Sequence, residues 1–322
     1  MNTKLLITIA VVFVVLGLVV WWWRKTGTPV ALLPELPAVE VKPVVPQPGA
    51  VRYTLQASLP EVERLPVYHW TTDRGNPSKW AGALGFAGEP QEVEDALEGT
   101  LYLWSQEGET LVISEDASSL SYRVDLKSNP ETLRGSFLPN FEQAAAIVER
   151  TLEEFGDVSG LLTYDPTKNK ALKVGVEYVN ETALEQAELV EIHLVAKVDD
   201  YSVYLGSGPE QDPVLAWVGR DGKLLRLEYH PLGALGEKIS DYPLKNPTEI
   251  LQDLDSGKGV VVSSNLEGGE EIVSITITKT DLGYLLPQPE ATIIQPIFVL
   301  TGSARTASGK SGAITVYLPA VD

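Results

Sequence analysis

The segment Leu5–Trp23 constrains this chain more than any other feature. Its 19 residues carry no charge and hold one Thr and one Gly among aliphatic and aromatic side chains. At ~1.5 Å per residue, a helix of this length spans roughly 28 Å, close to the ~30 Å hydrocarbon core of a bilayer. Lys4 precedes the segment, and Arg24 and Lys25 follow it. The pattern predicts one transmembrane helix, with the bilayer as a partner through residues 5–23.

The flanks of this segment favour an uncleaved anchor over a cleaved signal peptide. A signal peptide has an apolar core of about 7 to 15 residues and ends in small residues. This segment is longer and ends in a tryptophan belt followed by two cations, which is typical of a membrane interface. The short N-terminal tail and the proline-rich sequence that follows favour a cytoplasmic N-terminus and a body outside the plasma membrane. The predicted anchor residues are Leu5, Phe13, Trp21, Trp22, Trp23, Arg24 and Lys25.

Prolines define the next segment, residues 26–50, which holds six of them and only three charged residues. Proline at this density blocks both helices and sheet ladders. We therefore expect an extended linker between the anchor at 1–25 and a folded body that begins near residue 51.

The charge of the body excludes some classes of partner. Beyond residue 25 the chain holds 22 Lys and Arg against 44 Asp and Glu, a formal charge of −22. Such a surface repels the phosphates of nucleic acids, so we expect no nucleic-acid partner. The chain has no Cys, which excludes disulfides, thiolate catalysis and cysteine-based metal sites.

Three helices are predicted from their start and stop signals. Each begins after an Asn that can cap it and ends before a Gly, and the second and third add the reciprocal Gln or Glu of a capping box. The caps are Asn76, Asn140 and Asn246, and the glycines are Gly85, Gly156 and Gly257.

Alternating apolar and polar residues between turn signals predict strands. Glu107-Gly108 and Asp221-Gly222 indicate hairpin turns. The order of a helix followed by meandering strands, which occurs twice, is typical of an α+β fold. We expect two antiparallel-sheet modules, 51–135 and 136–322, each with a covering helix. The expected strands are 51–58, 66–70, 100–104, 110–114, 119–125, 171–179, 188–198, 201–206, 214–218, 223–229, 259–263, 271–278, 295–301 and 313–318, with a loop at 302–312.

Two motifs imitate ligand sites without meeting their requirements. Gly309-Lys310-Ser311 has Ala304 where a phosphate-binding loop needs its first Gly, and a strand rather than a helix follows. Asp253 and Asp255 imitate the start of a calcium loop, but Gly257 stands where a third oxygen ligand is needed. We therefore expect no bound nucleotide, metal or other cofactor.

The remaining candidates indicate structural roles. None of the three histidines has the helical spacing of a metal site. His193 alternates in an expected strand beside Glu191, and a surface or cross-strand role is expected for the histidines. Ser207 lies in Gly-Ser-Gly, which is not a nucleophile elbow. The acidic pairs are expected to lie in turns and the tryptophans in the core, so we predict that the chain is not an enzyme and has no catalytic residue. These candidates are His69, His193 and His230; Asp199-Asp200 and Glu270-Glu271; and Trp80, Trp104 and Trp217.

Several segments carry a family resemblance. They are the anchor, the hairpin 218–223, Tyr242–Lys245 before the last helix, Leu282–Tyr284, and Gln295–Phe298 before the final strand. Together they resemble the YycH/YycI type of extracytoplasmic regulatory protein and, more loosely, PepSY-like α+β modules. The resemblance implies a membrane-tethered protein that binds other proteins and, in some members, modulates a sensor histidine kinase.

These patterns predict a membrane-anchored extracytoplasmic protein that regulates a sensor kinase or another envelope process through contact with a protein partner in the envelope. Two alternatives stay open. One is an envelope hydrolase, which needs a cleft with opposed carboxylates roughly 5 to 9.5 Å apart. The other is a passive structural or adhesive surface protein.

Overall fold

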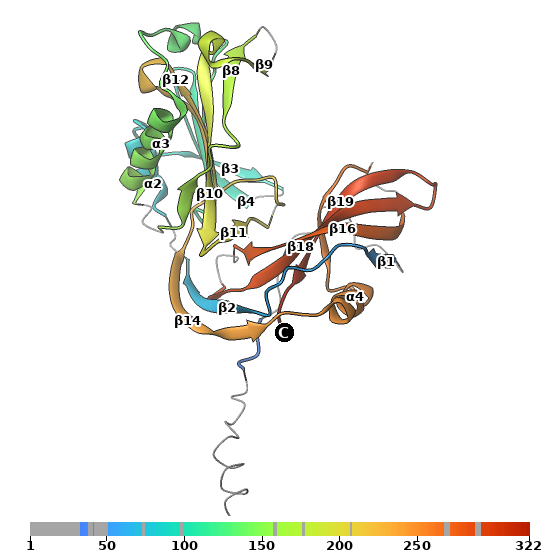
Figure 1. Ribbon diagram of the computed structural model, residues 1–322. Helices are drawn as coiled ribbons and strands as arrows, with labels where there is room; N and C mark the ends of the chain where they lie inside the picture. Colours follow the sequence, from blue (N-terminus) through green and yellow to red (C-terminus); the bar gives the residue numbers. More distant parts are fainter. Residues whose placement is uncertain are drawn as a thin grey trace, which may run out of the picture. The chain divides into compact units, whose positions relative to one another are not determined.

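β-strands dominate the described part of the chain, which holds nineteen strands and three α-helices (Figure 1). The computed structural model describes residues 33–37, 41, 51–72, 75–96, 99–156, 160–175, 178–206, 208–266, 271–286 and 291–322. The chain divides into two units, Met1–Leu36 and Pro37–Asp322. All of the described strands and helices belong to the second unit.

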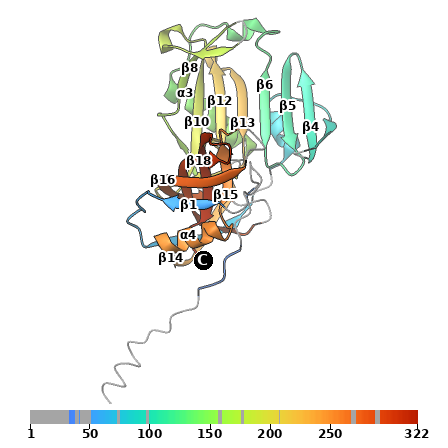
Figure 2. The ribbon, with the colours of Figure 1, turned by 90° about the vertical axis from the view of Figure 1, so that its right-hand side faces the viewer.

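Sixteen strands form one mixed sheet, and four of them branch from its main path. Figure 2 shows β8, β10, β12, β13, β6, β5 and β4 following one another across part of this sheet. The main path runs β15 (Val260–Ser264), β19 (Ser311–Pro319), β18 (Pro296–Thr306), β16 (Ile272–Leu285), β11 (Tyr201–Tyr204), β10 (Leu189–Val198), β12 (Val214–Gly219), β13 (Leu224–Tyr229), β6 (Leu120–Val124), β5 (Glu109–Ser114), β4 (Gly99–Gln106) and β3 (Gln91–Asp95). The branches are β1 (Arg52–Leu55) on β16, β7 (Leu162–Tyr164) and β8 (Lys170–Val174) on β10, and β9 (Val179–Glu181) on β8.

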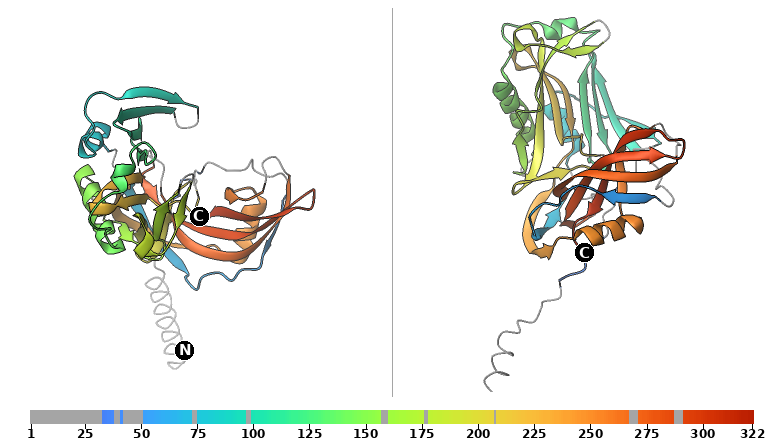
Figure 3. Two further views of the ribbon diagram at one scale, coloured as in Figure 1. Left: turned by 90° about the horizontal axis from the view of Figure 1, so that it is seen from above. Right: turned by 45° about the vertical axis from the view of Figure 1, so that its right-hand side comes forward.

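The strand β16 joins distant parts of the sequence. Along one side it pairs antiparallel with β18, and along the other it pairs in parallel first with β1 and then with β11 (Figure 3). These are the two parallel pairings within the described residues, and the pairing of β11 with β16 makes the sheet continuous. A separate three-stranded sheet holds β14 (Ala234–Pro243), β2 (Arg64–Thr71) and β17 (Ile293–Ile294).

The three described helices begin where the capping signals predicted. The Asn76 side chain accepts a hydrogen bond from the backbone of Lys79, and Asn140 and Asn246 complete capping boxes with Gln143 and Glu249. Each cap satisfies N–H groups that would otherwise lack a partner. The helices are α2 (Pro77–Ala83), α3 (Phe141–Phe155) and α4 (Pro247–Asp255), and short 3₁₀ turns occur at η1 (Pro130–Leu133), η2 (Leu184–Gln186) and η3 (Arg220–Gly222).

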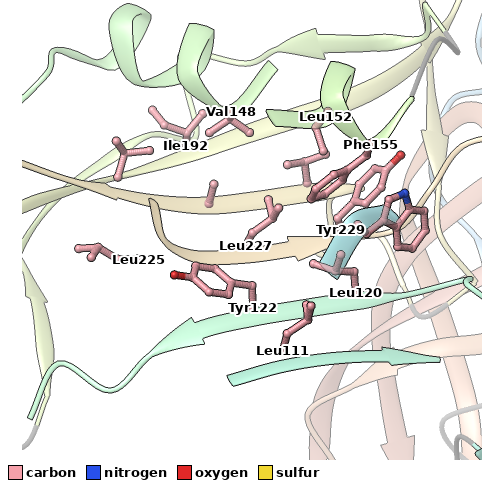
Figure 4. Packing of buried hydrophobic residues seen from close by; sticks show 14 of the residues in the cluster. Leu111, Leu120, Tyr122, Val148, Leu152, Phe155, Ile192, Leu225, Leu227 and Tyr229 are labelled. Atoms are coloured by element: carbon pink, nitrogen blue, oxygen red, sulfur yellow. The ribbon is translucent and has the colours of Figure 1, made fainter. Parts of the chain in front are cut away.

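The largest hydrophobic core lies between α3 and the sheet. Figure 4 shows Val148 and Leu152 of α3 facing the side chains of β10 and β13. Trp80 of α2 fills one end, with its ring centroid 5.8 Å from that of Phe155 and 5.7 Å from that of Tyr229. Burying one such side chain stabilises the fold by about 1.5–3 kcal/mol. A Cβ at Gly75 would lie 1.7 Å from the Trp80 ring, so glycine is required there.

A second core lies beneath α4. Ile250 and Leu254 of this helix pack with aliphatic side chains of β16, β18 and β19. Both cores follow the periodicity of the sequence, since the buried positions recur at three and four in the helices and at two in the strands.

The predicted fold class is wrong. The sequence indicated an α+β protein with antiparallel-sheet modules, whereas the described chain is mostly β and its main sheet is a single mixed one. The reason is physical: alternation predicts that a segment is a strand but not which strand pairs with it, and the parallel partners β11 and β16 are far apart in the sequence.

Two local predictions are also wrong. Residues 302–312 are not a loop, because β18 and β19 extend into a tight hairpin, and 171–179 is not one strand.

The membrane predictions also need correction. Within the described residues, no helix is long and apolar enough to cross a membrane. The longest of them, α3, has 15 residues, which at ~1.5 Å per residue falls short of a ~30 Å hydrocarbon core. This finding corrects the prediction of a single-pass, plasma-membrane protein, and the orientation derived from it loses its basis. The predicted anchor Leu5–Trp23, with Arg24 and Lys25, lies outside the described residues.

The predicted boundary near residue 135 stays a prediction. Side chains from both sides of that position share one core, since Trp80 and Tyr122 are buried in the same cluster as Val148 and Leu227. Most of the predicted linker, residues 26–50, lies outside the described residues.

Candidate functional site

His193 is the one buried histidine among the three, and it lies at the centre of a polar cluster. It belongs to β10, whose residues are buried on both faces. Because side chains alternate along a strand, Ile192 and Leu194 point into the core beneath α3, whereas Glu191 and His193 project from the opposite face. His69 is exposed on β2, and His230 follows β13.

Both ring nitrogens of His193 contact carboxylates. Nδ1 lies 2.8 Å from Oδ2 of Asp212, and Nε2 lies 3.1 Å from Oε1 of Glu191. Two lysines complete the charge pairing, since Lys168 pairs with Asp212 and Lys170 lies 2.9 Å from Glu191. We call this group, with Trp217, the histidine cluster.

Trp217 closes the cluster on the side of β12. Its indole N–H donates a hydrogen bond of 2.8 Å to Oε2 of Glu191. The guanidinium of Arg226, on the neighbouring strand β13, lies 5.0 Å from the centre of the Trp217 ring, which is within the range of a cation–π contact. The prediction of a core tryptophan is confirmed for Trp80 and Trp104, which are buried, whereas Trp217 is only half-buried.

The bonding of the cluster favours the charged forms of His193 and Glu191. Burial lowers the pKa of His193, but the hydrogen bonds to Asp212 and Glu191 and their negative charges outweigh burial and raise the pKa above its ordinary value. Burial likewise raises the pKa of Glu191, but the hydrogen bonds from His193, Lys170 and Trp217 outweigh it and lower the pKa to about 2. The imidazolium and both carboxylates therefore stabilise one another.

This bonding limits the chemistry that His193 can perform. A general base or a metal ligand needs a ring nitrogen with a free lone pair. Both ring nitrogens of His193 lie within hydrogen-bond distance of carboxylates, so neither faces an open position for a substrate or a metal ion. The cluster is thus suited to holding β10 and the residues before β12 together. The predicted surface role of His193 is wrong because the ring is buried, and its two partners lie on its own strand and in a loop rather than on a facing strand.

A hollow of ≈ 470 Å³ opens beside the histidine cluster. Its wall includes Lys168, Lys170, His193 and Asp212, together with neutral polar groups of the β7–β8 loop. Glu181 of β9 and Glu210 also line it. Neither of these two carboxylates has a hydrogen bond or ion pair with any described residue.

A second polar group, which we call the lysine cluster, consists of Lys245, Asp253, Lys258 and Asp322. Lys245 lies 2.8 Å from Asp253 and 2.9 Å from Asp322, and Lys258 lies 2.7 Å from Asp253. Burial raises the pKa of Asp253, but the hydrogen bonds from Lys245 and Lys258 outweigh it and lower the pKa. The resemblance of Asp253 to a calcium ligand is thus explained by ion pairs that join α4 to residues before and after it.

The other sequence candidates lie apart from both clusters. Gly309 and Lys310 lie in the turn between β18 and β19, and Asp199-Asp200 form the turn between β10 and β11. Asp199 accepts a hydrogen bond from the Tyr68 hydroxyl at 3.0 Å. Ser207 and Glu270 lie outside the described residues.

Sequence reasoning missed Asp212, Lys168 and Lys170 as partners of His193. Asp212 and Lys168 come from loops, where no periodicity indicates which way a side chain points. The two lysines belong to no recognisable motif, so the sequence held no signal that would have identified them as partners of Asp212 and Glu191.

No protein-family model matches the chain, and no curated protein matches it. Among solved structures, the chain is similar to an uncharacterized protein from Eubacterium rectale, with 11% sequence identity and a TM-score of 0.41 over 83% of this chain and 87% of that one. A likeness of this size carries no argument about fold or function. The resemblance to YycH/YycI-type and PepSY-like proteins stays an interpretation of the sequence.

Proposed function

We propose that this protein binds another protein and regulates it by contact, without catalysing a reaction. One observation carries the proposal: both ring nitrogens of the buried His193 contact carboxylates, and each of these carboxylates also pairs with a lysine. A group held in this way stabilises a surface rather than transferring protons.

The charge of the chain supports a protein partner with basic side chains. The chain carries a formal charge of −19, and carboxylates line the hollow beside the histidine cluster. An acidic surface attracts cationic partners and accelerates their association. It disfavours nucleic acids, whose phosphates it repels.

The test combines capture with a direct binding measurement. The full chain is first crosslinked to its partner in its own cells, and the partner is identified. The affinity between the purified partner and the purified full chain is then measured. We expect a discrete partner that binds with defined stoichiometry and whose own activity changes when it is bound.

An activity assay on the same purified protein can contradict the proposal. Purified chain and a His193→Gln variant are incubated with peptide and glycan substrates. Turnover by the original chain that the variant lacks would assign His193 to catalysis and overturn the proposal.

A further inference from the structure

We propose that the outer edge of β9 receives an extended, positively charged segment of the partner protein, which adds a strand to the sheet. This inference rests on the proposed function and specifies the partner's surface. The surface, which we call the β9 edge, comprises Tyr178–Glu181 with Leu184 after it and the adjoining hollow.

The backbone of β9 offers hydrogen-bonding groups on its outer side. β9 pairs with β8, and β8 pairs with β10 on its other side (Figure 1). The carbonyl of Tyr178 and the N–H of Thr182 bond toward β8. Because such bonds alternate along an antiparallel pair, the N–H and C=O groups of Val179 and Glu181 point away from β8. No described residue bonds to them. An edge of this kind is a template for an added strand.

Exposed apolar side chains flank this edge. Tyr178 is 72% exposed and Leu184 is 39% exposed, and both belong to the few large hydrophobic side chains that are exposed in the described part of the chain. Tyrosine is among the residues that contribute most to protein interfaces, because it buries a large area and loses little conformational entropy. Tyr178 directly precedes β9, so a segment lying along the strand would cover its side chain.

The charges beside the edge favour a cationic segment over an anionic one. Lys168, Lys170 and His193 are already paired with Asp212 and Glu191. Glu181 and Glu210, which lack such partners among the described residues, also line the hollow. The pKa of Lys170 is raised mainly by the hydrogen bond to Glu191, and the charge of Glu181 is the smallest of the causes that raise it. Incoming lysine or arginine side chains would therefore find two carboxylates that have no ion pair with a described residue.

The strand β3 provides a matched comparison within the same sheet. It lies at one end of the main path and carries Glu92, Glu94 and Asp95. Within the described residues, it has no exposed large hydrophobic side chain. Both strands therefore have acidic side chains at their edge. Only β9 also has an exposed aromatic residue, Tyr178, and the adjoining hollow.

The test uses the full chain and a labelled, capped eight-residue peptide of alternating Lys and Val, with binding measured by fluorescence anisotropy. A peptide of alternating Glu and Val and a Lys–Val peptide with alternate backbone nitrogens methylated serve as controls. We expect the Lys–Val peptide to bind, and both controls to bind at least about tenfold more weakly, since one lacks charge complementarity and the other lacks the donors of an added strand. Equal binding of all three peptides would overturn the proposal.

Protein variants locate the binding on the chain. Glu181→Gln should weaken the Lys–Val peptide about threefold, as expected for one partly exposed ion pair, and Tyr178→Ser about fivefold or more. Glu92→Gln on β3 should leave binding unchanged. A loss with Glu92→Gln that equals the loss with Glu181→Gln would refute the assignment to β9. Self-association that Tyr178→Ser abolishes would do so too, because the edge would then receive a second copy.

The failure of this site can be told apart from the failure of the proposed function. If the captured partner binds the original chain and the Tyr178→Ser and Glu181→Gln variants equally, the β9 edge is the wrong surface while the binding function stands. If the peptide binds at β9 but no captured protein binds the purified chain, the proposed function fails, and only the capacity of the β9 edge to receive a cationic strand stands.

Discussion

The histidine cluster and the lysine cluster use the same ion-pair chemistry but differ in which charges are buried. In the histidine cluster the carboxylates of Glu191 and Asp212 and the ring of His193 are buried, while the lysine side chains are 37% and 46% exposed. In the lysine cluster the buried groups are one ammonium, that of Lys245 at 4% exposure, and one carboxylate, that of Asp253 at 11%, while Asp322 reaches solvent.

This difference teaches which member of each cluster matters for stability. Removing an exposed partner leaves a charge that water still solvates, whereas removing a buried one leaves a charge or donor without compensation. The two clusters also differ in how their contribution to stability depends on pH, because only the histidine cluster contains a histidine.

The largest effect is expected for Lys245→Met. The substitution removes the buried ammonium and leaves Asp253 with only the exposed Lys258 as a partner. Breaking a buried ion pair from one side typically destabilises a protein by about 3–5 kcal/mol, and we expect about 3 kcal/mol because Lys258 remains. Urea unfolding followed by tryptophan fluorescence measures the loss.

Lys258→Met is the matched control for this substitution. Its ammonium contacts the same carboxylate, but its side chain is 54% exposed, so the expected loss is under about 1 kcal/mol. Equal losses for the two lysines would show that burial does not set the strength of this cluster.

Glu191→Leu is expected to have the next largest effect. It removes the acceptor for three donors, namely the indole of Trp217, the ring of His193 and the ammonium of Lys170. A buried donor without a partner costs about 1–3 kcal/mol, and we expect a total loss of about 2 kcal/mol because Lys170 can turn to solvent. A loss below about 0.5 kcal/mol in urea unfolding would mean that the hydrogen bonds to Glu191 add nothing to stability.

Local structure could be predicted from the sequence where one segment determines it alone. The Asn caps and glycine stops of α2, α3 and α4 each act on the adjacent turn of their own helix. The tight turns at Glu107-Gly108 and Asp221-Gly222 have positive φ angles, which Gly and, to a lesser degree, Asp favour. The mixed sheet could not be predicted, because alternation carries no information about which strand lies beside β16.

The candidate site was predictable only in part. The position of His193 beside Glu191 on one strand could be predicted from the sequence, but its burial between two carboxylates could not. Its second carboxylate could not, because Asp212 belongs to a loop that approaches β10 only after β12 has paired with it. The free edge of β9 was hidden for a similar reason, since 171–179 was interpreted as one strand.

The pH dependence of stability distinguishes the clusters at smaller amplitude. The folded-state pKa of His193 is raised above 6.5, so its contribution is complete below pH 6.5 and is lost as the pH rises through the folded pKa. Asp253 and Glu191 have lowered pKa values, that of Glu191 being about 2. Their contributions are present above the ordinary carboxyl pKa values and are lost as the pH falls through the folded ones.

Urea unfolding at a series of pH values measures both limbs. We expect His193→Gln to remove the decline above pH 6.5 and to leave much of the acid limb, while His69→Gln, at an exposed position on β2, keeps both. A decline above pH 6.5 that survives in His193→Gln would assign it to another group and remove the distinction between the clusters.

The smallest effect is expected for Lys170→Ala. Its ammonium pairs with Glu191 at 2.9 Å, but the side chain is 46% exposed, so solvent screens the pair and the loss should be about 0.2–1 kcal/mol. Glu191 keeps the hydrogen bonds from His193 and Trp217, which are shielded from solvent. Raising the salt concentration to about 0.5 M should therefore shrink the difference between Lys170→Ala and the original chain in urea unfolding, and leave the effect of Glu191→Leu nearly unchanged. If salt reduced both differences equally, the buried hydrogen bonds would be as screened as the exposed ion pair, and the contrast in burial within the histidine cluster would lose its energetic meaning.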